Sequence, residues 1–253
     1  MLSDKNVLVL GASGLLGTKV IKSLLQHSCK VFAVDLDIER LKDNLKKINV
    51  DIESSALSMS CLDVTDELAV KIFFDSLEDI SGAVNCTYPR NRNYGSHFFD
   101  VTLADFNENL SLHLGSSFLL MQQCAAYFKR EEKEFSLVNI SSIYGVVAPK
   151  FEVYHHTKMT MPVEYAAIKS ALLHLSKYVV AYVADSRFRV NSVSPGGIFD
   201  HQPHDFVEAY KRNTLGKGML DVDDVMGSIV YLLSDYSRYV NGQNIVVDDG
   251  FIL

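Results

Sequence analysis

Two tyrosine–lysine pairs with the same spacing are the groups in this chain that could transfer a proton. Lys158 follows Tyr154 and Lys169 follows Tyr165, each by four residues, which places both side chains on one face of a helix. A phenol has an unperturbed pKa of about 10, and a neighbouring ammonium group favours its ionised form. We therefore expect one pair to work as an acid–base group, with the lysine lowering the pKa of the phenol.

The position of Pro162 distinguishes the two pairs. Pro162 lies four residues after Lys158, where it would disrupt a helix that included the first pair. The same proline suits the start of a helix that contains Tyr165. Apolar residues then continue at helical spacing behind the second pair, and a helix holds a catalytic side chain more firmly than a loop does. The sequence therefore predicts that Tyr165 and Lys169 react.

A serine at the end of an expected strand could complete the site. Ser142 closes the run Val138–Ser142, and its hydroxyl could bind a substrate oxygen while hydride moves to or from the adjacent carbon. Ser141 is the neighbouring alternative. An isolated serine or tyrosine is more often structural, but the combination with a dinucleotide-binding loop upstream favours catalysis.

That loop is the glycine-rich turn at residues 11–17. It follows an apolar strand directly and opens an amphipathic helix. Glycines let the backbone turn sharply and approach a pyrophosphate, whose charge then lies at the helix N-terminus. We expect a dinucleotide to contact Gly11, Ser13, Gly14, Leu15 and Gly17.

Acidic residues follow the next two expected strands. A carboxylate at Asp35 could accept hydrogen bonds from the adenosine ribose and would repel a 2′-phosphate. Because no arginine is adjacent to Asp35 or within the glycine loop, the sequence favours NAD over NADP. Asp63 and Val64 could meet the adenine, with helix capping as the alternative role for Asp63.

The elements that must position these residues alternate regularly along the chain. Seven short apolar runs read as strands: Asn6–Leu10, Lys30–Val34, Ala56–Cys61, Gly82–Cys86, Ser136–Ile140, Arg187–Val193 and Asn244–Val247. Helical patterns between them, such as Leu15–His27, Glu67–Leu77 and Leu103–Lys129, predict an α/β fold with a parallel sheet covered on both faces. We expect a single domain over residues 1–253, with the long connections 146–162 and 197–220 as functional loops beside the ligand.

Composition narrows the class of protein. A net charge of -7 argues against a general nucleic-acid or anionic-membrane surface. The four cysteines show no paired spacing and suggest buried, reduced thiols of a cytoplasmic protein, and the N-terminus lacks a signal-peptide pattern. The histidines His155, His156, His201 and His204 have no accompanying carboxylate cluster, so we expect no metal site.

Taken in order, these motifs resemble the short-chain dehydrogenase/reductase family over essentially the whole chain. The matching segments are Gly11–Gly17, Leu62–Val64, Asn85, Ile140–Ser142, Tyr165–Lys169, Ser194–Gly197 and Asn241–Gly250. The resemblance implies a Rossmann-like three-layer sandwich with a doubly wound, mainly seven-stranded parallel sheet. It implies that Ser142, Tyr165 and Lys169 are catalytic and that Tyr165 and Lys169 also bind the cofactor. It further implies that Asn85 supports the cofactor strand and that Pro195, Gly196 and Ile198 contact the nicotinamide end. It also implies a homodimer or homotetramer formed through the helices at Leu103–Lys129 and Pro162–Ala184.

Two departures from the family pattern affect candidate site residues. The usual Asn-Asn-Ala-Gly is replaced by Asn85-Cys86-Thr87-Tyr88-Pro89-Arg90-Asn91. The asparagine expected shortly before Gly115 is displaced, with Asn109 the nearest candidate for the fourth catalytic position and Leu112 or His113 as alternatives.

The segment after Asn85 and the lengthened loop before Tyr165 resemble reductases of bacterial flagellin-glycosylation and sialic-acid-like sugar pathways. Basic residues on these segments should border the pocket and favour an anionic sugar or sugar nucleotide; the candidate contacts are Arg90, Arg92, Lys150 and His155, with His156 and Lys158 beside them. Solvated surface charge is the alternative. The competing functions are a ketoacyl-type or general carbonyl reductase and a non-catalytic dinucleotide-sensing scaffold.

Overall fold

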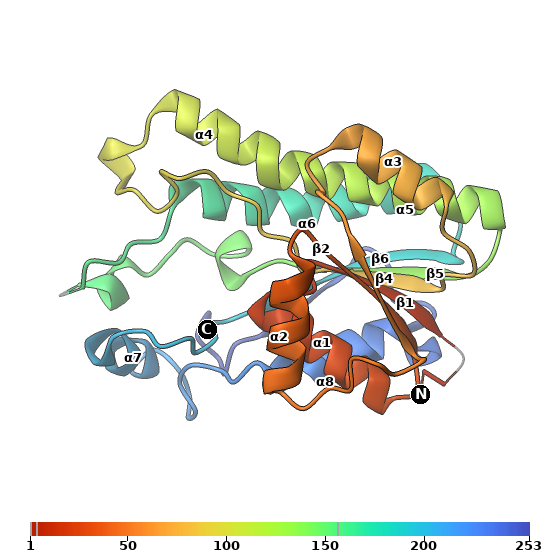
Figure 1. Ribbon diagram of the computed structural model, residues 1–253. Coiled ribbons are helices and arrows are strands. Elements are labelled where there is room, and N and C mark those ends of the chain that lie inside the picture. The colour runs from red at the N-terminus through yellow and green to blue at the C-terminus, as the bar shows by residue number, and fades with distance from the viewer. Residues whose placement is uncertain (1, 4, 156) are drawn as a thin grey trace.

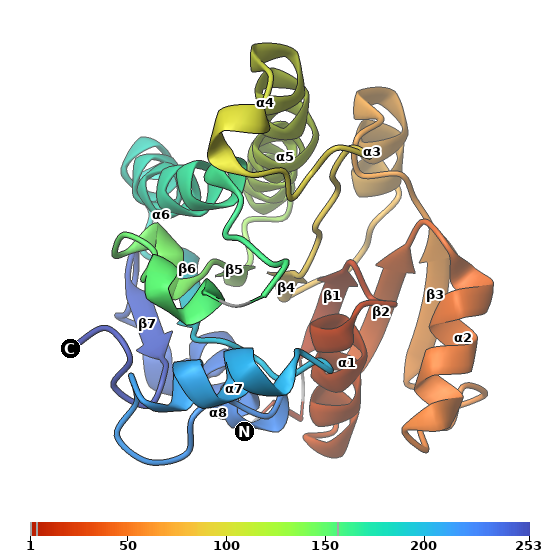
Figure 2. The same cartoon turned by 90° about the vertical axis from the view of Figure 1, so that its left-hand side faces the viewer.

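Seven parallel strands form one sheet in the order β3-β2-β1-β4-β5-β6-β7. The computed structural model describes residues 2–3, 5–155 and 157–253. The strands are β1 Asn6–Leu10, β2 Lys30–Asp35, β3 Leu57–Cys61, β4 Gly82–Asn85, β5 Phe135–Ile140, β6 Phe188–Pro195 and β7 Asn244–Val247. In the central register Val9 lies opposite Ala33 of β2 and Val84 of β4. The order reverses between β1 and β4, so the connections that follow these two strands lead to opposite faces of the sheet and leave a crevice suited to a ligand (Figures 1 and 2).

Helices cover both faces of the sheet (Figures 1 and 2). One layer holds α3 Glu67–Asp75, α5 Ser116–Glu131 and α6 Val163–Val183, and the other holds α1 Leu15–Gln26, α2 Ile38–Lys47 and α8 Asp223–Leu233. Each layer buries its own apolar core against the sheet. The predicted doubly wound, three-layer architecture is confirmed, as is each of the seven strands. Within the described residues, no helix is long and apolar enough to span a bilayer.

Burial differs between the centre and the edges of the sheet. Every residue of β4, β5 and β6 is buried, as expected of strands covered on both faces, whereas β3 and β7 at the edges are partly exposed. The prediction that all four cysteines are buried is confirmed for Cys29 and Cys124. It is wrong for Cys61, which ends edge strand β3 and is exposed, and Cys86 is only partly buried. The four thiols are unpaired.

The stretch predicted as one helix at Leu103–Lys129 contains a change of helix type. The short helix α4 (Leu103–Asn109) runs into a π-helical turn, η2 (Leu110–Gly115), before α5 begins. A π-helical turn inserts an extra residue into the helix and is often found at functional sites. It turns His113 into the protein interior, where the side chain is buried.

Pro162 begins the helix of the second tyrosine–lysine pair, as the sequence predicts. It is the N-cap of α6, and Tyr165 and Lys169 lie in the first two turns. Tyr154 instead ends the short 3-10 helix η4 (Phe151–Tyr154), and Lys158 lies in a bend beyond it. One continuous helix therefore presents only the second pair.

The two long connections pack against each other rather than into the sheet. They contain η4 and the helix α7 (His204–Lys211), and with the chain end they enclose a small apolar cluster of their own. Tyr210 of α7 stacks on Phe251 with ring centroids 4.3 Å apart, and the Tyr154 ring lies 5.1 Å from that of Phe206. The connections thus form an ordered layer beyond the carboxyl ends of β5 and β6.

A glycine fixes the distance between the end of β5 and α6. Gly145 ends the 3-10 turn η3 (Ile143–Gly145), and a Cβ at this position would lie 2.7 Å from the backbone carbon and oxygen of Lys169. Both neighbours are backbone atoms, so the added methyl group would push η3 and α6 apart.

We predict that Gly145→Ala lowers the free energy of unfolding by about 1–3 kcal/mol, the usual cost of overpacking. Gly227→Ala is the matched control, because a Cβ on this α8 glycine meets nothing within 4 Å. The control should raise stability by about 0.5–1 kcal/mol through helix propensity. Urea titrations of both variants measure this; equal effects would show that the η3–α6 contact is not tight.

Candidate active site

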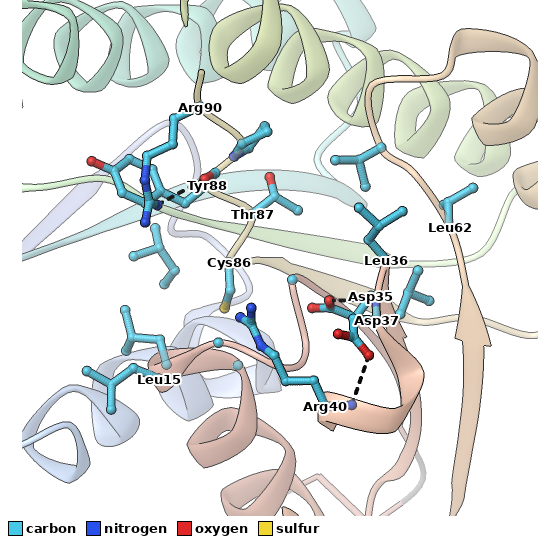
Figure 3. Close-up of a pocket in the computed structure, with 18 of the residues that line it drawn as sticks. Leu15, Asp35, Leu36, Asp37, Arg40, Leu62, Cys86, Thr87, Tyr88 and Arg90 are labelled. Carbon is cyan, nitrogen blue, oxygen red and sulfur yellow. Dashed lines mark hydrogen bonds between the residues drawn. The ribbon is translucent and has the colours of Figure 1, made fainter. Parts of the chain in front are cut away.

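A pocket of about 810 Å³ opens at the carboxyl ends of the central strands. Its lining combines the glycine loop after β1, the ends of β2 and β3, the segment after β4, the end of β5 and the catalytic candidates on α6. Figure 3 shows the part of the lining that includes Leu15, Asp35 and Tyr88. The predicted site residues that line it are Gly11, Gly14, Leu15, Gly17, Asp35, Asp63, Val64, Arg90, Tyr165 and Lys169. The sheet therefore brings the dinucleotide candidates and the proton-transfer pair to one cavity.

The N-terminus of α1 has the properties of an anion-binding site. Gly14 is its N-cap, no side chain caps the helix, and its first turn contains no acidic residue. In contrast, the side chains of Asp37, Asp66 and Thr102 cap α2, α3 and α4. The first backbone N–H groups of α1 thus remain available, and the helix dipole favours a negative group there.

The glycines of the loop are required by close backbone contacts. Gly11 has a φ of +73°, and a Cβ on it would lie 2.7 Å from the carbonyl of Cys86. A Cβ on Gly17 would lie 2.2 Å from the carbonyl oxygen of Gly11. Within the same loop the buried Ser13 hydroxyl has no hydrogen-bond partner. This cradle fits a dinucleotide, whose diphosphate needs close backbone approach and hydrogen-bond donors.

Asp35 holds the end of β2 to the glycine loop. Its Oδ2 accepts a hydrogen bond of 2.8 Å from the backbone N–H of Ser13, and its Oδ1 accepts one of 3.2 Å from that of Asp37. Figure 3 also shows Arg40 extending from α2 toward Cys86, and Arg40 lines the pocket. Arg40 thus brings a positive charge to this corner, although no arginine is adjacent to Asp35 in sequence or within the glycine loop. Arg40 is five residues from Asp35 in sequence, and the first turn of α2 brings it back to the cavity.

Asp63 lines the pocket but does not cap the following helix. Its Oδ1 accepts from the backbone N–H of Thr65 at 2.8 Å and from the Thr65 hydroxyl at 2.6 Å, while Asp66 caps α3. The helix-capping alternative for Asp63 is excluded by this geometry. The carboxylate instead shapes the turn that places Val64 at the cavity.

Asn85 ties the end of β4 to its surroundings. Its Oδ1 accepts from the backbone N–H and the hydroxyl of Thr87 at 3.1 and 2.7 Å. Its amide donates to Asn139 Oδ1 on β5 at 3.3 Å and to the Ser117 hydroxyl on α5 at 3.5 Å. Asn85 is buried and does not belong to the described pocket lining. It therefore supports the segment after β4, which does line the pocket, from the protein interior.

Ser142, rather than Ser141, faces the candidate phenol. The Ser142 side chain hydrogen-bonds with Tyr165, and its Oγ accepts from the backbone N–H of Tyr144 at 3.2 Å. Ser141 donates its hydroxyl to the Lys169 carbonyl at 3.0 Å, a contact that joins β5 to α6. The two serines therefore differ in their contacts: Ser141 lines the pocket and joins β5 to α6, whereas Ser142 lies outside the described lining and contacts the phenol.

Lys169 is deeply buried beside this phenol. Its Nζ donates to the Ile140 carbonyl at 2.8 Å and lies 5.5 Å from the centroid of the Tyr165 ring. Burial lowers the pKa of Lys169 to about 8. Desolvation in turn raises the pKa of Tyr165, against a lowering contribution from the hydrogen bond with Ser142. The expectation that the lysine lowers the pKa of the phenol is thus wrong for the protein alone, because burial dominates at both groups.

An unpredicted aromatic group adjoins the reacting pair. Tyr88 stands where the family pattern has a glycine, and its ring lies 5.7 Å from both the Tyr165 ring and Lys169 Nζ. Its hydroxyl donates to that of Tyr94, and its ring packs edge-on against His113 at 5.0 Å. The replacement of glycine by tyrosine in Asn85–Tyr88 was the available sequence signal for this contact.

Asn109 and His113 occupy different places around the π-helical turn. Asn109 is fully buried; its amide donates to Asn91 at 3.2 Å and to Glu164 at 3.3 Å. Burial and the positive charge of Lys169 together lower the pKa of His113 to about 2. The geometry directs Asn109 toward the loop after β4, whereas His113, one of the alternatives, lies near enough to Lys169 for that charge to affect its pKa.

Other predicted contacts lie outside the described pocket lining. Gly196 donates its backbone N–H to the Val247 carbonyl at 2.8 Å, and Ile198 forms a parallel β-bridge with Leu220. Backbone contacts therefore hold both residues in the segment that follows β6. Pro195 ends β6. Lys150 Nζ donates to the Phe251 carbonyl at 2.7 Å, which uses its charge to hold the chain end.

Arg92 lies beside the cavity in an adjoining hollow, and Arg90 lines both. His155 and Lys158 are exposed on the 146–162 connection, and His156 lies outside the described residues. In the part of the chain that the structure describes, no three His, Cys, Asp or Glu side chains cluster as a metal site would require.

Comparisons with known proteins agree with this geometry. The family model described as enoyl-(acyl carrier protein) reductase matches residues 11–252. Post-translational flagellin modification protein A of Campylobacter coli is 35% identical over 256 residues, which cover 99% of each chain. A short-chain dehydrogenase of Leptospira borgpetersenii with bound NAD+ superposes with a TM-score of 0.87 at 32% identity, over 100% of this chain and 94% of that one.

A gluconate 5-dehydrogenase of Burkholderia cenocepacia, in complex with NADP and tartrate, shares the fold with a TM-score of 0.84. It is 20% identical, over 99% of this chain and 96% of that one. Solved structures of this fold thus hold either dinucleotide. The full-length family match and the motifs assembled around the pocket agree: the chain belongs to the short-chain dehydrogenase/reductase family and is an NAD(P)-dependent oxidoreductase.

Proposed function

We propose that residues 1–253 form one catalytic domain that uses NAD(H) to interconvert a hydroxyl and a carbonyl group on a polar, anionic sugar. The observation that carries the proposal is the Tyr165 phenol, hydrogen-bonded to Ser142 and 5.5 Å from the buried ammonium of Lys169, at a pocket with a glycine cradle. Such a set supplies the proton that must accompany each hydride.

In the direction of reduction, the Ser142 hydroxyl donates a hydrogen bond to the substrate carbonyl oxygen. Tyr165 gives its proton to that oxygen as the carbon accepts hydride, and the phenolate that remains is stabilised by the nearby ammonium. In oxidation the same phenol receives the proton of the substrate hydroxyl. The nicotinamide supplies or accepts the hydride when it is bound. Proton and hydride together balance the change of two electrons at the substrate carbon.

Lys169 is placed to stabilise negative charge rather than to react itself. With a pKa of about 8 it is mainly protonated at neutral pH, and its hydrogen bond to Ile140 fixes the ammonium behind Tyr165. A fixed charge in a water-poor site stabilises a phenolate more than the same charge in solvent would. Cys86 also lines the pocket, but desolvation raises the pKa of its thiol to about 12, so it stays neutral.

An anionic sugar is supported by the basic side chains at the cavity and by a relative. Arg90 lines the pocket and Arg92 the adjoining hollow, in a chain with a net charge of -7. The Campylobacter coli relative is a flagellin modification protein, which is consistent with chemistry on a sugar precursor. Lys150 is not part of this proposal, because it binds the Phe251 carbonyl.

NAD is favoured by the carboxylates at the end of β2. Asp35 and Asp37 both line the corner where the adenosine ribose would lie, and together they outnumber the single positive charge of Arg40. A 2′-phosphate would approach two carboxylates, whereas a ribose diol could donate hydrogen bonds to them.

We also propose a cytoplasmic homo-oligomer. Aromatic side chains are exposed along α5 and α6, including Phe118 and the stacked rings of Tyr178 and Tyr182. Exposed apolar groups of this kind on adjacent helices are typical of an association surface. The absence of disulfides among the four cysteines is consistent with a reducing compartment.

The proposal predicts different outcomes for the two tyrosines. Tyr165→Phe removes the acid–base hydroxyl and should lower kcat at least a hundredfold, the usual contribution of general acid–base catalysis. Tyr154→Phe should retain more than a third of the activity, because Tyr154 packs in the loop cluster. Steady-state rates with NADH and a panel of keto sugars measure both, and fluorescence titration with NADH should give a similar Kd for each variant. Equal losses of activity would contradict the assignment.

Cofactor choice can be tested with a pair of substitutions at one corner of the pocket. Asp35→Ala removes a carboxylate and should raise the NADP/NAD ratio of kcat/KM at least tenfold. Arg40→Ala removes the opposing positive charge and should lower that ratio or leave it unchanged. If Asp35→Ala leaves the ratio unchanged, the carboxylate does not set the preference.

A further inference from the structure

A second hollow adjoins the catalytic pocket. It measures about 860 Å³ and shares Arg40, Tyr88 and Arg90 with the pocket, while Arg92 belongs to the hollow alone. We call it the arginine hollow. A ligand whose reacting carbon lies at Tyr165 could extend into it without leaving the protein surface.

The arginine hollow has an excess of positive charge. Three arginines and one glutamate line it, and Glu108 accepts a hydrogen bond of 2.7 Å from the Asn91 amide. Within residues 2–3, 5–155 and 157–253, no ion pair involves Arg40, Arg90 or Arg92. Arg90 and Arg92 thus form no ion pair with a described carboxylate of this chain, whose net charge is -7, whereas Arg40 shares its corner of the pocket with Asp35 and Asp37.

Arg90 is oriented by aromatic contacts. Its guanidinium carbon lies 4.7 Å from the centroid of Tyr88 and 6.0 Å from that of Tyr94. One of its N–H groups donates to the Tyr88 carbonyl at 3.4 Å. Stacking on a ring face leaves the edge of a guanidinium, with its remaining N–H donors, for an anion. Because Tyr88 also contacts the Tyr165 ring at 5.7 Å, the guanidinium is one aromatic ring away from the reacting phenol.

The residue between the two arginines is firmly anchored. Asn91 donates its backbone N–H to Asn109 Oδ1 at 2.9 Å, and its side-chain amide donates to Asp105 at 3.0 Å and to Glu108 at 2.7 Å. Asn109 is fully buried and also donates to Glu164, the residue before Tyr165. The network couples the loop of Arg90 and Arg92 to the catalytic helix. It also gives Asn109 a positioning role in place of the catalytic role predicted from the sequence.

We propose that the arginine hollow binds a phosphoryl group of the substrate, through Arg90 and Arg92. A phosphoryl dianion suits two arginines on one loop better than a single carboxylate does, because each planar guanidinium can donate two hydrogen bonds to its oxygens. The ligand is therefore a phosphate ester, either a sugar monophosphate or the diphosphate of an activated sugar. The assignment of this ligand as substrate rests on the proposed function, whereas its binding does not require turnover.

The test is calorimetric titration of the NAD-bound protein with glucose 6-phosphate, UDP-glucose, gluconate and glucose. At least one phosphate ester should bind, at least tenfold more tightly than gluconate, and glucose should give no signal at the same concentration. The tighter of the two esters identifies the source of the phosphoryl group. Absence of binding by both esters, or equal binding of gluconate, would overturn the proposal.

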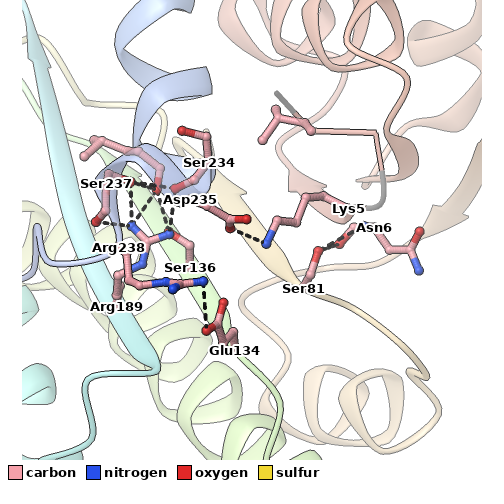
Figure 4. A network of polar contacts seen from close by, with 12 residues as sticks. Lys5, Asn6, Ser81, Glu134, Ser136, Arg189, Ser234, Asp235, Ser237 and Arg238 are labelled. Carbon is pink, nitrogen blue, oxygen red and sulfur yellow. Dashed lines mark hydrogen bonds and ion pairs between the residues drawn. The ribbon is translucent and has the colours of Figure 1, made fainter.

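Variants separate this hollow from the cofactor site and from general charge effects. Arg90→Gln and Arg92→Gln should each weaken binding of the phosphate ester about tenfold or more, the usual value of a charge-assisted hydrogen bond, with less than a twofold change in the Kd of NAD. Arg238→Gln removes the same charge at the amino end of β5, where Arg238 faces Glu134, and should leave both affinities unchanged (Figure 4).

A loss of NAD affinity in Arg90→Gln as large as the loss of ester affinity would assign the arginine to the cofactor diphosphate and contradict the proposal. Tyr165→Phe should bind the ester like the wild type. This variant distinguishes the two proposals. If it has lost hydride transfer but still binds the ester, the arginine hollow binds its ligand independently of catalysis. Unfolding midpoints of the arginine variants within the range of the wild type confirm that the losses are local.

Discussion

The hydrogen bond from Lys169 Nζ to the Ile140 carbonyl is the contact on which the arrangement of the active site depends. It connects the catalytic helix α6 to the carboxyl end of β5, the strand that leads directly to Ser142. The bond from Ser141 to the Lys169 carbonyl runs beside it, and Gly145 permits the backbone approach that both bonds need. Through these contacts the sheet, which is covered on both faces, sets the distance between Ser142 and Tyr165. The proton-transfer groups are therefore positioned by the scaffold, and the loops around them are free to determine the substrate.

This arrangement has an electrostatic cost. Taking an ammonium group out of water lowers the pKa of Lys169 to about 8, and the same lack of solvent raises the pKa of Tyr165. The rings of Tyr88 and Tyr94 add to the apolar surroundings, and burial also raises the pKa of both of these phenols. In the protein alone, burial therefore favours the neutral form of Tyr165.

Sequence reasoning predicted the fold well because its signals are local. Apolar runs between helical patterns specify a parallel sheet, and Pro162 separates the two tyrosine–lysine pairs through a helix start that lies next to it in sequence. The errors arose where distant residues meet. Arg40 reaches the pocket through the first turn of α2, and Lys150 is bound by the chain end. The π-helical turn buries His113, while Asn109 hydrogen-bonds to Asn91 and Glu164. The pKa of Tyr165 could not be predicted either, because spacing indicates a neighbouring charge but says nothing of desolvation.

The proposed chemistry requires Tyr165 to become an acid–base group beside Lys169 when the cofactor occupies the pocket. It is tested most directly by the difference in phenolate absorbance between the wild type and Tyr165→Phe, titrated with and without NAD+. We predict that Tyr165 ionises above its ordinary pKa of about 10 in the protein alone and well below that value with NAD+ bound. A Tyr165 phenol that stays neutral up to pH 10 both with and without NAD+ would contradict this role.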